Sequence, residues 1–370
     1  MEPLELVPGR YIGEGQPCFI IAEIGQNHQG DVELAKNLIL RAKECGADCV
    51  KFQKSSLKDK FNRHALARPY SGPHAWADAY GAHKEHLEFS REEFQELQNY
   101  AREVGIPLTA SAMDIPTVEL LDELGVPFIK VGSGDVHNLP LLRRAAATGR
   151  PLVVSSGMSD IEWVSRVYEE LSAAQDPPTP LVILQCTSAY PTPPEHVHLR
   201  VLDTYAQVFP HAHIGYSGHE LGIHVTVAAV ARGARVVERH ITLNKSWKGS
   251  DHACSLEPHE LRELVEAVRS VEAALGSPLK AFQPSEEPCF LKLGKDGSGR
   301  PEPEGGGDAA GGGRRGEGGR AARPPCDPSG RAGGRVPQPR RGGGREHPGG
   351  GRLVRRGGLG APGARVSSEA

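Results

Sequence analysis

Two lysines in short β-rich segments of this sequence indicate a site for an anion. Lys51 lies in the segment Cys49–Gln53, and Lys130 lies in Phe128–Val131. Lysine supplies a compact positive charge, and serine hydroxyls supply directed hydrogen-bond donors. Glycines in Gly132–Gly134 allow a ligand to approach backbone N–H groups closely. Together with the hydroxyls, the two lysines predict a pocket for a phosphate or a carboxylate. The serines concerned are Ser111, Ser133, Ser155 and Ser217.

Two histidines at the ends of the last two β-rich segments indicate a metal ion. His219 and His240 can each give one ring nitrogen to a divalent cation, while an acceptor such as Glu238 or Asp251 holds the other. Two histidines without a thiolate leave positions for water or substrate oxygens, which favours Mn²⁺, Mg²⁺ or a similar cation. His28, in the first loop, is a weaker candidate for the same role.

The apolar pattern predicts a scaffold that brings these side chains together. Short β-rich segments alternate with amphipathic helical stretches, which is typical of parallel βαβ units. The β-rich segments are Phe19–Glu23, Cys49–Gln53, Pro107–Ser111, Phe128–Val131, Leu152–Ser155, Leu181–Cys186, His213–Ser217 and Arg235–His240. The helical stretches are Asp31–Cys45, Glu92–Val104, Pro116–Leu124, Leu139–Ala147, Asp160–Ser172, Gly222–Arg232 and Glu257–Leu275. This count predicts an α/β fold, a (β/α)₈ TIM barrel.

A doubly wound open sheet is the alternative fold, but no GxGxxG follows the first predicted strand. In a TIM barrel the chemistry lies at the carboxyl ends of the strands. Every predicted strand ends in polar groups, which include Glu23, Gln53, Asp135 and Tyr190. The long connection 54–89 is rich in aromatic residues and favours an ordered lid over the mouth of the barrel.

The composition divides the chain of 370 residues near residue 295. Residues 296–370 hold 24 of the 45 Gly and no aromatic side chain. Such a segment cannot bury enough apolar surface to fold, so we expect a folded domain at 1–295 and a disordered low-complexity tail at 296–370. No apolar run approaches the about 20 residues of a membrane span. Seven cysteines without a CxxC pair indicate reduced thiols in the cytoplasm.

Several strings of this chain resemble the sialic acid synthases, which condense phosphoenolpyruvate with an N-acetylmannosamine. The strings are AEIGQNHQGD from Ala22, VKFQK from Val50, FIKVGSGD from Phe128, SSGM from Ser155, QCTSAYPTPPE from Gln185, GYSGHE from Gly215, ERHITL from Glu238 and WKGSDHACSLEP from Trp247. They cover about residues 1–295 and are most similar to the vertebrate cytosolic type. The resemblance implies that N-acetylmannosamine 6-phosphate, or the free sugar, is converted to N-acetylneuraminate 9-phosphate and phosphate.

The resemblance also implies roles for single residues. Phosphoenolpyruvate binding is implied for Lys51, Ser111, Lys130, Ser133, Ser155 and Ser217, and metal binding for His219 and His240. Positions around the sugar and the reacting carbons are implied for Glu23, Gln53, Asp135, Tyr190 and Asp251. Asp135 replaces a Glu of bacterial members, and Ser188 replaces an Asn. A homodimer is implied, with no nucleic-acid or membrane partner.

The resemblance ends at Lys295. In the family, a C-terminal antifreeze-like domain then covers the partner subunit's site and supplies an Arg. Residues 296–370 instead resemble GC-rich DNA translated in the wrong frame or through an intron. An RGG-like RNA-binding segment is the alternative, but its interleaved aromatics are missing. We therefore expect near-normal phosphoenolpyruvate affinity, low turnover and a weakened dimer.

Two rival functions fit the same residues. A Schiff-base aldolase would use Lys51 or Lys130 as its nucleophile. The second rival is a catalytically impaired barrel that only binds its ligands. Trapping with borohydride would support the first rival, and loss of activity on chelation would support a metal-dependent synthase.

Overall fold

The computed structural model describes residues 2–173 and 179–295. The chain divides at Pro284 into two units, each described by itself. In the second unit the described regular structure is the helix α12 (Glu287–Leu293). The tail predicted for 296–370 lies outside the described residues.

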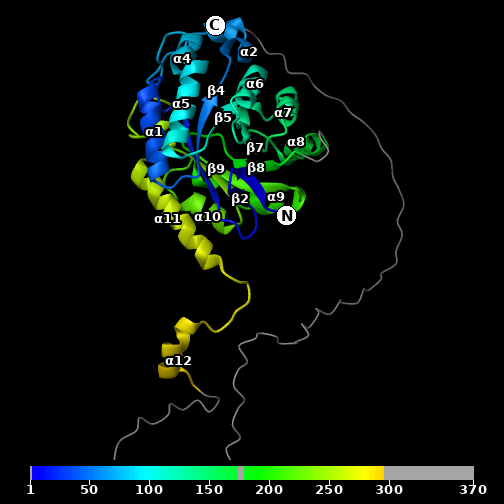
Figure 1. Ribbon diagram of the computed structural model, residues 1–370, viewed down its shortest axis with the longest axis vertical. Coiled ribbons are helices and arrows are strands. Elements are labelled where there is room, and N and C mark those ends of the chain that lie inside the picture. The colour runs from blue at the N-terminus through cyan, green and yellow to red at the C-terminus, as the bar shows by residue number, and fades with distance from the viewer. Residues whose placement is uncertain (1, 174–178, 296–370) are drawn as a thin grey trace, which may run out of the picture. The chain divides into compact units, whose positions relative to one another are not determined.

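The first unit is a closed barrel of parallel strands surrounded by helices (Figure 1), as the sequence predicted. Around the barrel run β3 (Phe19–Gly25), β4 (Cys49–Lys54), β5 (Leu108–Ala112), β6 (Ile129–Val131), β7 (Leu152–Ser155), β8 (Leu181–Cys186), β9 (Ala212–Gly218) and β10 (Val236–His240). Pairing of β10 with β3 closes the ring. The helices outside it are α1 (Val32–Glu44), α5 (Arg91–Val104), α6 (Ile115–Glu123), α7 (Leu139–Ala146), α8 (Ile161–Ala173), α9 (Val201–Val208), α10 (His224–Ala231) and α11 (Pro258–Leu275).

Strand alternation separates two apolar clusters. Because successive side chains of a strand point to opposite faces, Phe19 and Ile21 of β3 face the barrel interior, whereas Ile20 and Ile24 face the helices. The interior cluster also contains side chains of the N-terminal hairpin, formed by β1 (Leu4–Val7) and β2 (Arg10–Ile12). These are Leu6, Val7 and Ile12. The interior is therefore filled with apolar groups near the amino ends of the strands, which leaves the carboxyl ends for polar groups.

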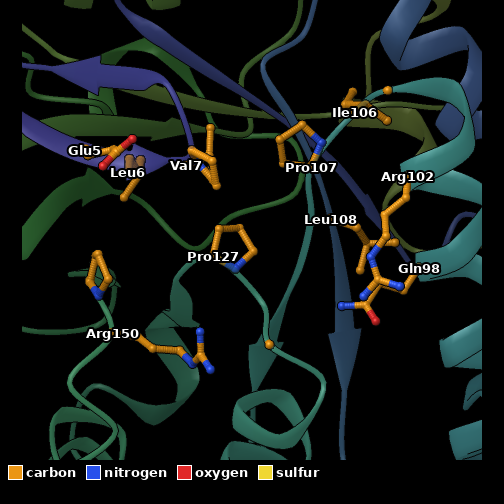
Figure 2. Close-up of a pocket in the computed structure, with 14 residues that line it drawn as sticks. Glu5, Leu6, Val7, Gln98, Arg102, Ile106, Pro107, Leu108, Pro127 and Arg150 are labelled. Carbon is orange, nitrogen blue, oxygen red and sulfur yellow. The ribbon is translucent and has the colours of Figure 1, made fainter.

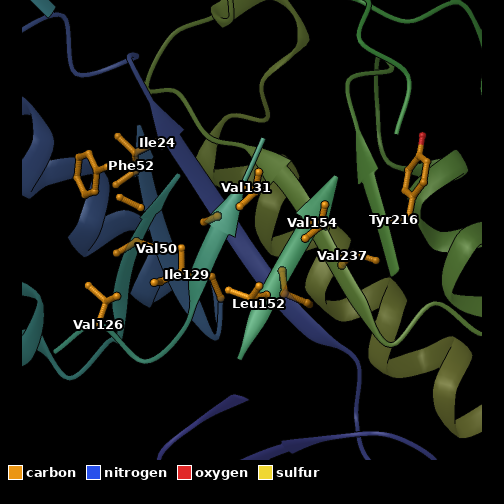
Figure 3. Packing of buried hydrophobic residues seen from close by; sticks show 14 of the residues in the cluster. Ile24, Val50, Phe52, Val126, Ile129, Val131, Leu152, Val154, Tyr216 and Val237 are labelled. Atoms are coloured by element: carbon orange, nitrogen blue, oxygen red, sulfur yellow. The ribbon is translucent and has the colours of Figure 1, made fainter. Parts of the chain in front are cut away.

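The outer cluster fastens the helices to the barrel. Figure 3 shows part of it, including Ile24 and Phe52 on one side and Val154 and Val237 on the other. The helix α1 shows how the sequence builds this layer. Asp31 caps its first turn through the backbone N–H groups of residues 33 and 34, and one face of the helix is buried. Each large side chain buried in this way contributes about 1.5–3 kcal/mol, so the layer holds the strand ends rigidly.

Some elements were not predicted. The hairpin and α9 (Val201–Val208) had no counterpart in the sequence pattern. The connection expected as an ordered lid contains three short helices, α2 (Leu57–Lys60), α3 (Arg63–Ala67) and α4 (Tyr80–Leu87). The helix α5 begins with a capping box, in which Ser90 and Glu93 exchange hydrogen bonds. No helix among the described residues is long and apolar enough to cross a membrane.

Candidate active site

The strand register places the predicted functional side chains next to one another. Glu23 on β3 is paired with Lys51 on β4 and with His240 on β10. Ser111 is paired with Lys130, and Ser217 with Glu238. Residues at the same level of adjacent strands face the same layer of the barrel. The polar layer therefore follows directly from the closure of the barrel.

These side chains line a cavity of about 350 Å³ at the carboxyl ends of the strands. It is lined by all but one of the predicted site residues, namely Glu23, Lys51, Gln53, Ser111, Lys130, Ser133, Asp135, Ser155, Tyr190, Ser217, His219 and His240. The exception is Asp251, which lies beside the cavity with its Oδ2 3.7 Å from His240 Nδ1. The cavity also includes residues outside the predicted set, of which Lys60, Ser188 and Glu238 carry polar groups.

Two buried lysines and two buried glutamates form the charged floor of the cavity. Lys51 Nζ lies 2.5 Å from Glu23 Oε2 and 2.8 Å from Ser111 Oγ. Lys130 Nζ lies 3.3 Å from Glu238 Oε1, which is also 3.6 Å from Lys51 Nζ. All four charged groups are at most 5% exposed. Buried charges persist only when they are paired, and here each lysine is held by a carboxylate.

The pKa values show how these charges are distributed. Burial raises the pKa of Glu23, although Lys51 opposes the shift. Burial alone would raise the pKa of Glu238 as well, but Lys130 and Lys51 outweigh it and lower the pKa to about 2. For the lysine Lys130, burial has the opposite effect and lowers the pKa. The negative charge of Glu238 offsets only part of this shift. Glu238 is thus a fixed negative charge, whereas Glu23 is the carboxyl better suited to exchange a proton.

Several buried polar atoms of the cavity lack a partner. Ser155 Oγ, Ser188 Oγ and Glu238 Oε2 have no hydrogen-bond partner among the described residues. Ser133 Oγ accepts the backbone N–H of Gly157 at 3.0 Å, which fixes it at the rim of the same cavity. Leaving a buried polar group unsatisfied costs about 1–3 kcal/mol, so a site that contains several of them is built for a polar ligand.

The two predicted metal ligands lie together at the neighbouring ends of β9 and β10. The ring centroids of His219 and His240 are 5.3 Å apart, and the ring of Tyr190 lies 4.1 Å from that of His219. His219 Nδ1 lies 3.0 Å from the carbonyl oxygen of Thr187, which can only accept a hydrogen bond. His219 Nδ1 therefore donates this hydrogen bond, and Nε2 is the ring nitrogen left for a metal ion. Burial lowers the pKa of His240, which also favours its neutral form.

The donor set fits a cation with open positions. His240 Nδ1 is buried without a hydrogen-bond partner among the described residues. No group of three His, Cys, Asp or Glu side chains in the described part of the chain is arranged to hold a metal by itself. Two imidazoles would therefore bind an ion whose remaining positions are filled by water or substrate oxygens.

His28 does not join this pair. It stacks on Phe89 with 4.1 Å between ring centroids, and its Nδ1 accepts the backbone N–H of Gly30. Burial lowers the pKa of His28 to about 3. This histidine is a neutral packing residue, so the weaker metal candidate of the sequence analysis is wrong.

A buried ion pair that the sequence analysis missed lies directly behind the two histidines. Glu220 follows His219, and Arg239 precedes His240. Arg239 Nη1 lies 3.0 Å from Glu220 Oε1, and both side chains are at most 1% exposed. Tyr216 and Thr226 donate their hydroxyls to the same carboxylate at 2.8 and 2.6 Å. The pair ties the loop after β9 to β10 and fixes the spacing of the histidines.

Breaking this pair is expected to destabilise the barrel strongly. Arg239→Met leaves Glu220 buried without its cation, which costs about 3–5 kcal/mol. The exposed pair of Arg91 and Glu123, at 2.8 Å, is the matched control, and Arg91→Met should cost about 0–1 kcal/mol. Urea unfolding of both variants measures the difference. Equal stabilities would show that the buried pair has no special role.

A second hollow, of about 650 Å³, lies near the amino ends of β5, β6 and β7 (Figure 2). Pro107, Pro127 and Arg150 are among its lining residues. Arg150 donates to the carbonyl of Val126 at 2.7 Å and to Asp122 at 2.8 Å, so its charge is already engaged. The predicted chemistry-bearing residues lie instead at the carboxyl ends of the strands.

Known proteins are similar to this chain over most of its length. Residues 38–280 match the NeuB family. The chain is 60% identical over 293 residues to the human N-acetylneuraminate-9-phosphate synthase, covering 79% of this chain and 80% of that protein. It is 38% identical over 280 residues to the N,N'-diacetyllegionaminic acid synthase of Legionella pneumophila, and the match covers 75% of this chain and 78% of that protein. The structure is similar to the N-acetylneuraminic acid (sialic acid) synthetase of Leptospira borgpetersenii, with a TM-score of 0.69 and 29% sequence identity. The match covers 79% of this chain and 96% of that chain.

Proposed function

This chain belongs to the NeuB family, and we propose that it condenses phosphoenolpyruvate with N-acetylmannosamine 6-phosphate in sialic acid biosynthesis. The products are N-acetylneuraminate 9-phosphate and inorganic phosphate. The arrangement of two buried lysines beside two buried histidines at one end of the barrel supports this function most directly. The lysines suit an anionic substrate, and the histidines suit the activation of a carbonyl.

Phosphoenolpyruvate carries two anionic groups, which match the two lysines. Lys51 and Lys130 would bind the phosphate and the carboxylate, displacing part of their contact with Glu23 and Glu238. Hydroxyls and backbone N–H groups complete the site. The hydroxyls are those of Ser111, Ser133, Ser155 and Ser217.

A divalent ion, Mn²⁺ or Mg²⁺, would be held by His219 and His240, and when bound it would polarise the aldehyde oxygen of the open-chain sugar. The enol carbon of phosphoenolpyruvate adds to the aldehyde carbon, and a cationic centre develops at the adjacent carbon that bears the phosphate ester. Water adds there, and phosphate leaves with cleavage of the carbon–oxygen bond. Glu23, whose pKa is raised by burial, would exchange a proton with that water.

The other cavity residues would orient the sugar. Gln53 Nε2 lies 3.3 Å from Glu23 Oε1, which holds both groups beside His240. Asp135 and Tyr190 line the outer part of the cavity, and Asp251 lies against His240. Their carboxylate and hydroxyl groups suit the hydroxyl and N-acetyl groups of the substrate.

We assign the protein to the cytoplasm, where the thiols of the buried cysteines stay reduced.

A Schiff-base aldolase fits the geometry less well. Burial alone would lower the pKa of Lys51, but Glu23 and Glu238 outweigh it and raise the pKa, so this amine stays protonated and is a poor nucleophile. Lys130 has the lower pKa but is held by Glu238. Borohydride added during turnover should therefore leave the mass of the chain unchanged. A covalent adduct on either lysine would favour the aldolase.

An assay of phosphate release tests the proposed function. The full chain is incubated with phosphoenolpyruvate, Mn²⁺ and either N-acetylmannosamine 6-phosphate or the free sugar, beside a human-type enzyme with its C-terminal domain. We expect release that requires a sugar and stops on chelation. Sugar-dependent release that chelation does not affect would contradict the metal assignment. Tight phosphoenolpyruvate binding without any release would favour a chain that only binds.

The affinity for phosphoenolpyruvate should fall at alkaline pH. Because burial lowers the pKa of Lys130, this side chain loses its charge at a lower pH than an ordinary lysine. Above that pKa the dissociation constant should rise about tenfold per pH unit, since only the protonated form binds the anion. Calorimetric titration from pH 7 to 10 measures the effect. Lys130→Arg keeps its charge and should give a flat profile, and a flat profile in the wild type would contradict the role of Lys130.

A further inference from the structure

If the chain catalyses the proposed condensation, on which this inference rests, the chemistry of that reaction dictates where the phosphate of the sugar lies. Phosphoenolpyruvate supplies the first three carbons of a nine-carbon product, so the aldehyde carbon of the sugar becomes carbon 4. A phosphate on carbon 9 is therefore the one on carbon 6 of the sugar. It lies at the far end of the substrate from the reacting aldehyde, so it needs a second anion site away from Lys51 and Lys130.

Lys60 provides a cation at the outer part of the cavity. It ends the helix α2 and lines the cavity together with Asp135 and Met113. Its ammonium forms no ion pair within 4.0 Å among the described residues. Asp135 is the strongest nearby source of negative charge, and burial raises its own pKa. Lys60 therefore lines the cavity with a charge that Asp135 offsets only in part.

The other carboxylates near Lys60 already have partners. Glu88 Oε1 lies 2.6 Å from Lys54 Nζ, and Glu88 Oε2 accepts the hydroxyl of Ser55 at 2.8 Å. Asp114 caps α6 by accepting the backbone N–H of Thr117 at 2.8 Å. Neither carboxylate is available to neutralise Lys60 without giving up these contacts.

A second lysine lies close to the first. Lys84 is on α4, which packs beside α2 (Figure 1), and its Nζ donates to Gln26 Oε1 at 3.0 Å. The two ammonium groups lie over neighbouring rings. Lys60 Nζ is 5.2 Å from the ring centroid of Phe61, and Lys84 Nζ is 5.7 Å from that of Tyr80. The two rings pack edge to face at 5.4 Å, which holds the lysines in one region.

The charges of the two lysines are only partly offset in the free protein, by Asp135 near Lys60 and by Asp251 near Lys84. Burial lowers the pKa of Lys60 and of Lys84, and the charge of Lys60 lowers the pKa of Lys84 further. An anion placed between them would relieve both the burial cost and their mutual repulsion. A phosphate dianion has the acceptors and the charge that two ammonium groups require.

We propose that Lys60 and Lys84 form the subsite that binds the phosphate on carbon 6 of the amino sugar. The subsite selects N-acetylmannosamine 6-phosphate over free N-acetylmannosamine. It also gives a function to the helices α2 and α4 of the long connection, which carry the two lysines, with Lys60 in the lining of the cavity and Lys84 beside it on the neighbouring helix. Asp135 and Asp251, the acidic groups that face the lysines, then remain free for hydroxyl groups of the sugar.

The test compares both sugars in variants of the full chain. With phosphoenolpyruvate and Mn²⁺, Lys60→Met and Lys84→Met should each raise KM for N-acetylmannosamine 6-phosphate by about 10- to 100-fold, as expected for a lost charge-assisted hydrogen bond. KM for phosphoenolpyruvate and kcat/KM for the free sugar should change far less than KM for the phosphorylated sugar. Lys60→Arg should retain most of the selectivity. Lys58→Met, on the exposed side of the same helix, is the control and should behave like the wild type.

The outcomes separate this proposal from the condensation itself. Selectivity for the phosphorylated sugar that survives in both methionine variants would overturn the subsite but not the activity. A wild-type chain that turns over neither sugar would contradict the condensation. Calorimetric titration of N-acetylmannosamine 6-phosphate into the metal-free chain would then decide the subsite. Weaker binding to Lys60→Met than to Lys58→Met supports it, and equal binding overturns it.

Discussion

Turnover should fall by about 1000-fold or more in His219→Ala and His240→Ala, while the fold and phosphoenolpyruvate affinity are retained. The physical reason is that a cation that polarises a carbonyl contributes several kcal/mol to the transition state, and each 1.4 kcal/mol is a factor of ten. The fold should persist because both side chains lie at strand ends, outside the apolar layer of the barrel. Phosphoenolpyruvate should still bind because its lysines lie on β4 and β6.

Two measurements check this expectation. Steady-state phosphate release gives the loss of turnover, and electron paramagnetic resonance of added Mn²⁺ gives metal binding without any turnover. His259→Ala is the control, since the side chain of His259 is 74% exposed on α11. Near-normal activity or near-normal Mn²⁺ binding in either site variant would remove the metal assignment.

Lys130→Met should weaken phosphoenolpyruvate binding by about 30- to 5000-fold, which corresponds to a loss of about 2–5 kcal/mol. The substitution removes one of two buried cations and leaves Lys51 as the cation nearest to Glu238. An incoming anion then meets net repulsion. Sugar binding should change little, because the sugar contacts lie farther out in the cavity.

Separate titrations of the two substrates measure this effect. Lys248→Met removes an exposed lysine from the segment after β10 and should leave both affinities unchanged. A Lys130→Met variant whose defect is confined to the sugar would contradict the assignment of the anion site.

Much of the fold and of the site could be predicted from the sequence, for identifiable reasons. The barrel strands are short apolar runs between amphipathic helices, and this period is visible in a single sequence. Since parallel strands must end on one face of a barrel, the polar residue after each run locates the cavity. The site residues Lys51, Lys130, His219 and His240 were found in this way, and the structure brings them together.

The remaining features depend on contacts between distant segments. Arg239 appears in the sequence as one charge in a strand, and only the fold shows it buried against Glu220. Lys60 belongs to a connection without a regular pattern, so its position in the cavity could not be predicted. His28 has the residue type of a metal ligand, but packing against Phe89 overrides that expectation. Polarity alone does not reveal which charge lacks a partner.

The central claim is that phosphoenolpyruvate reacts in this cavity by adding its enol carbon to the sugar and losing phosphate through carbon–oxygen cleavage. Phosphoenolpyruvate labelled with ¹⁸O in the bridging oxygen tests it most directly. Mass spectrometry of the products shows which molecule carries the label. We expect the label to leave with inorganic phosphate and the nine-carbon acid phosphate to form in equal amount. Label retained in the acid would mean that the phosphorus–oxygen bond breaks, and that result would contradict the mechanism.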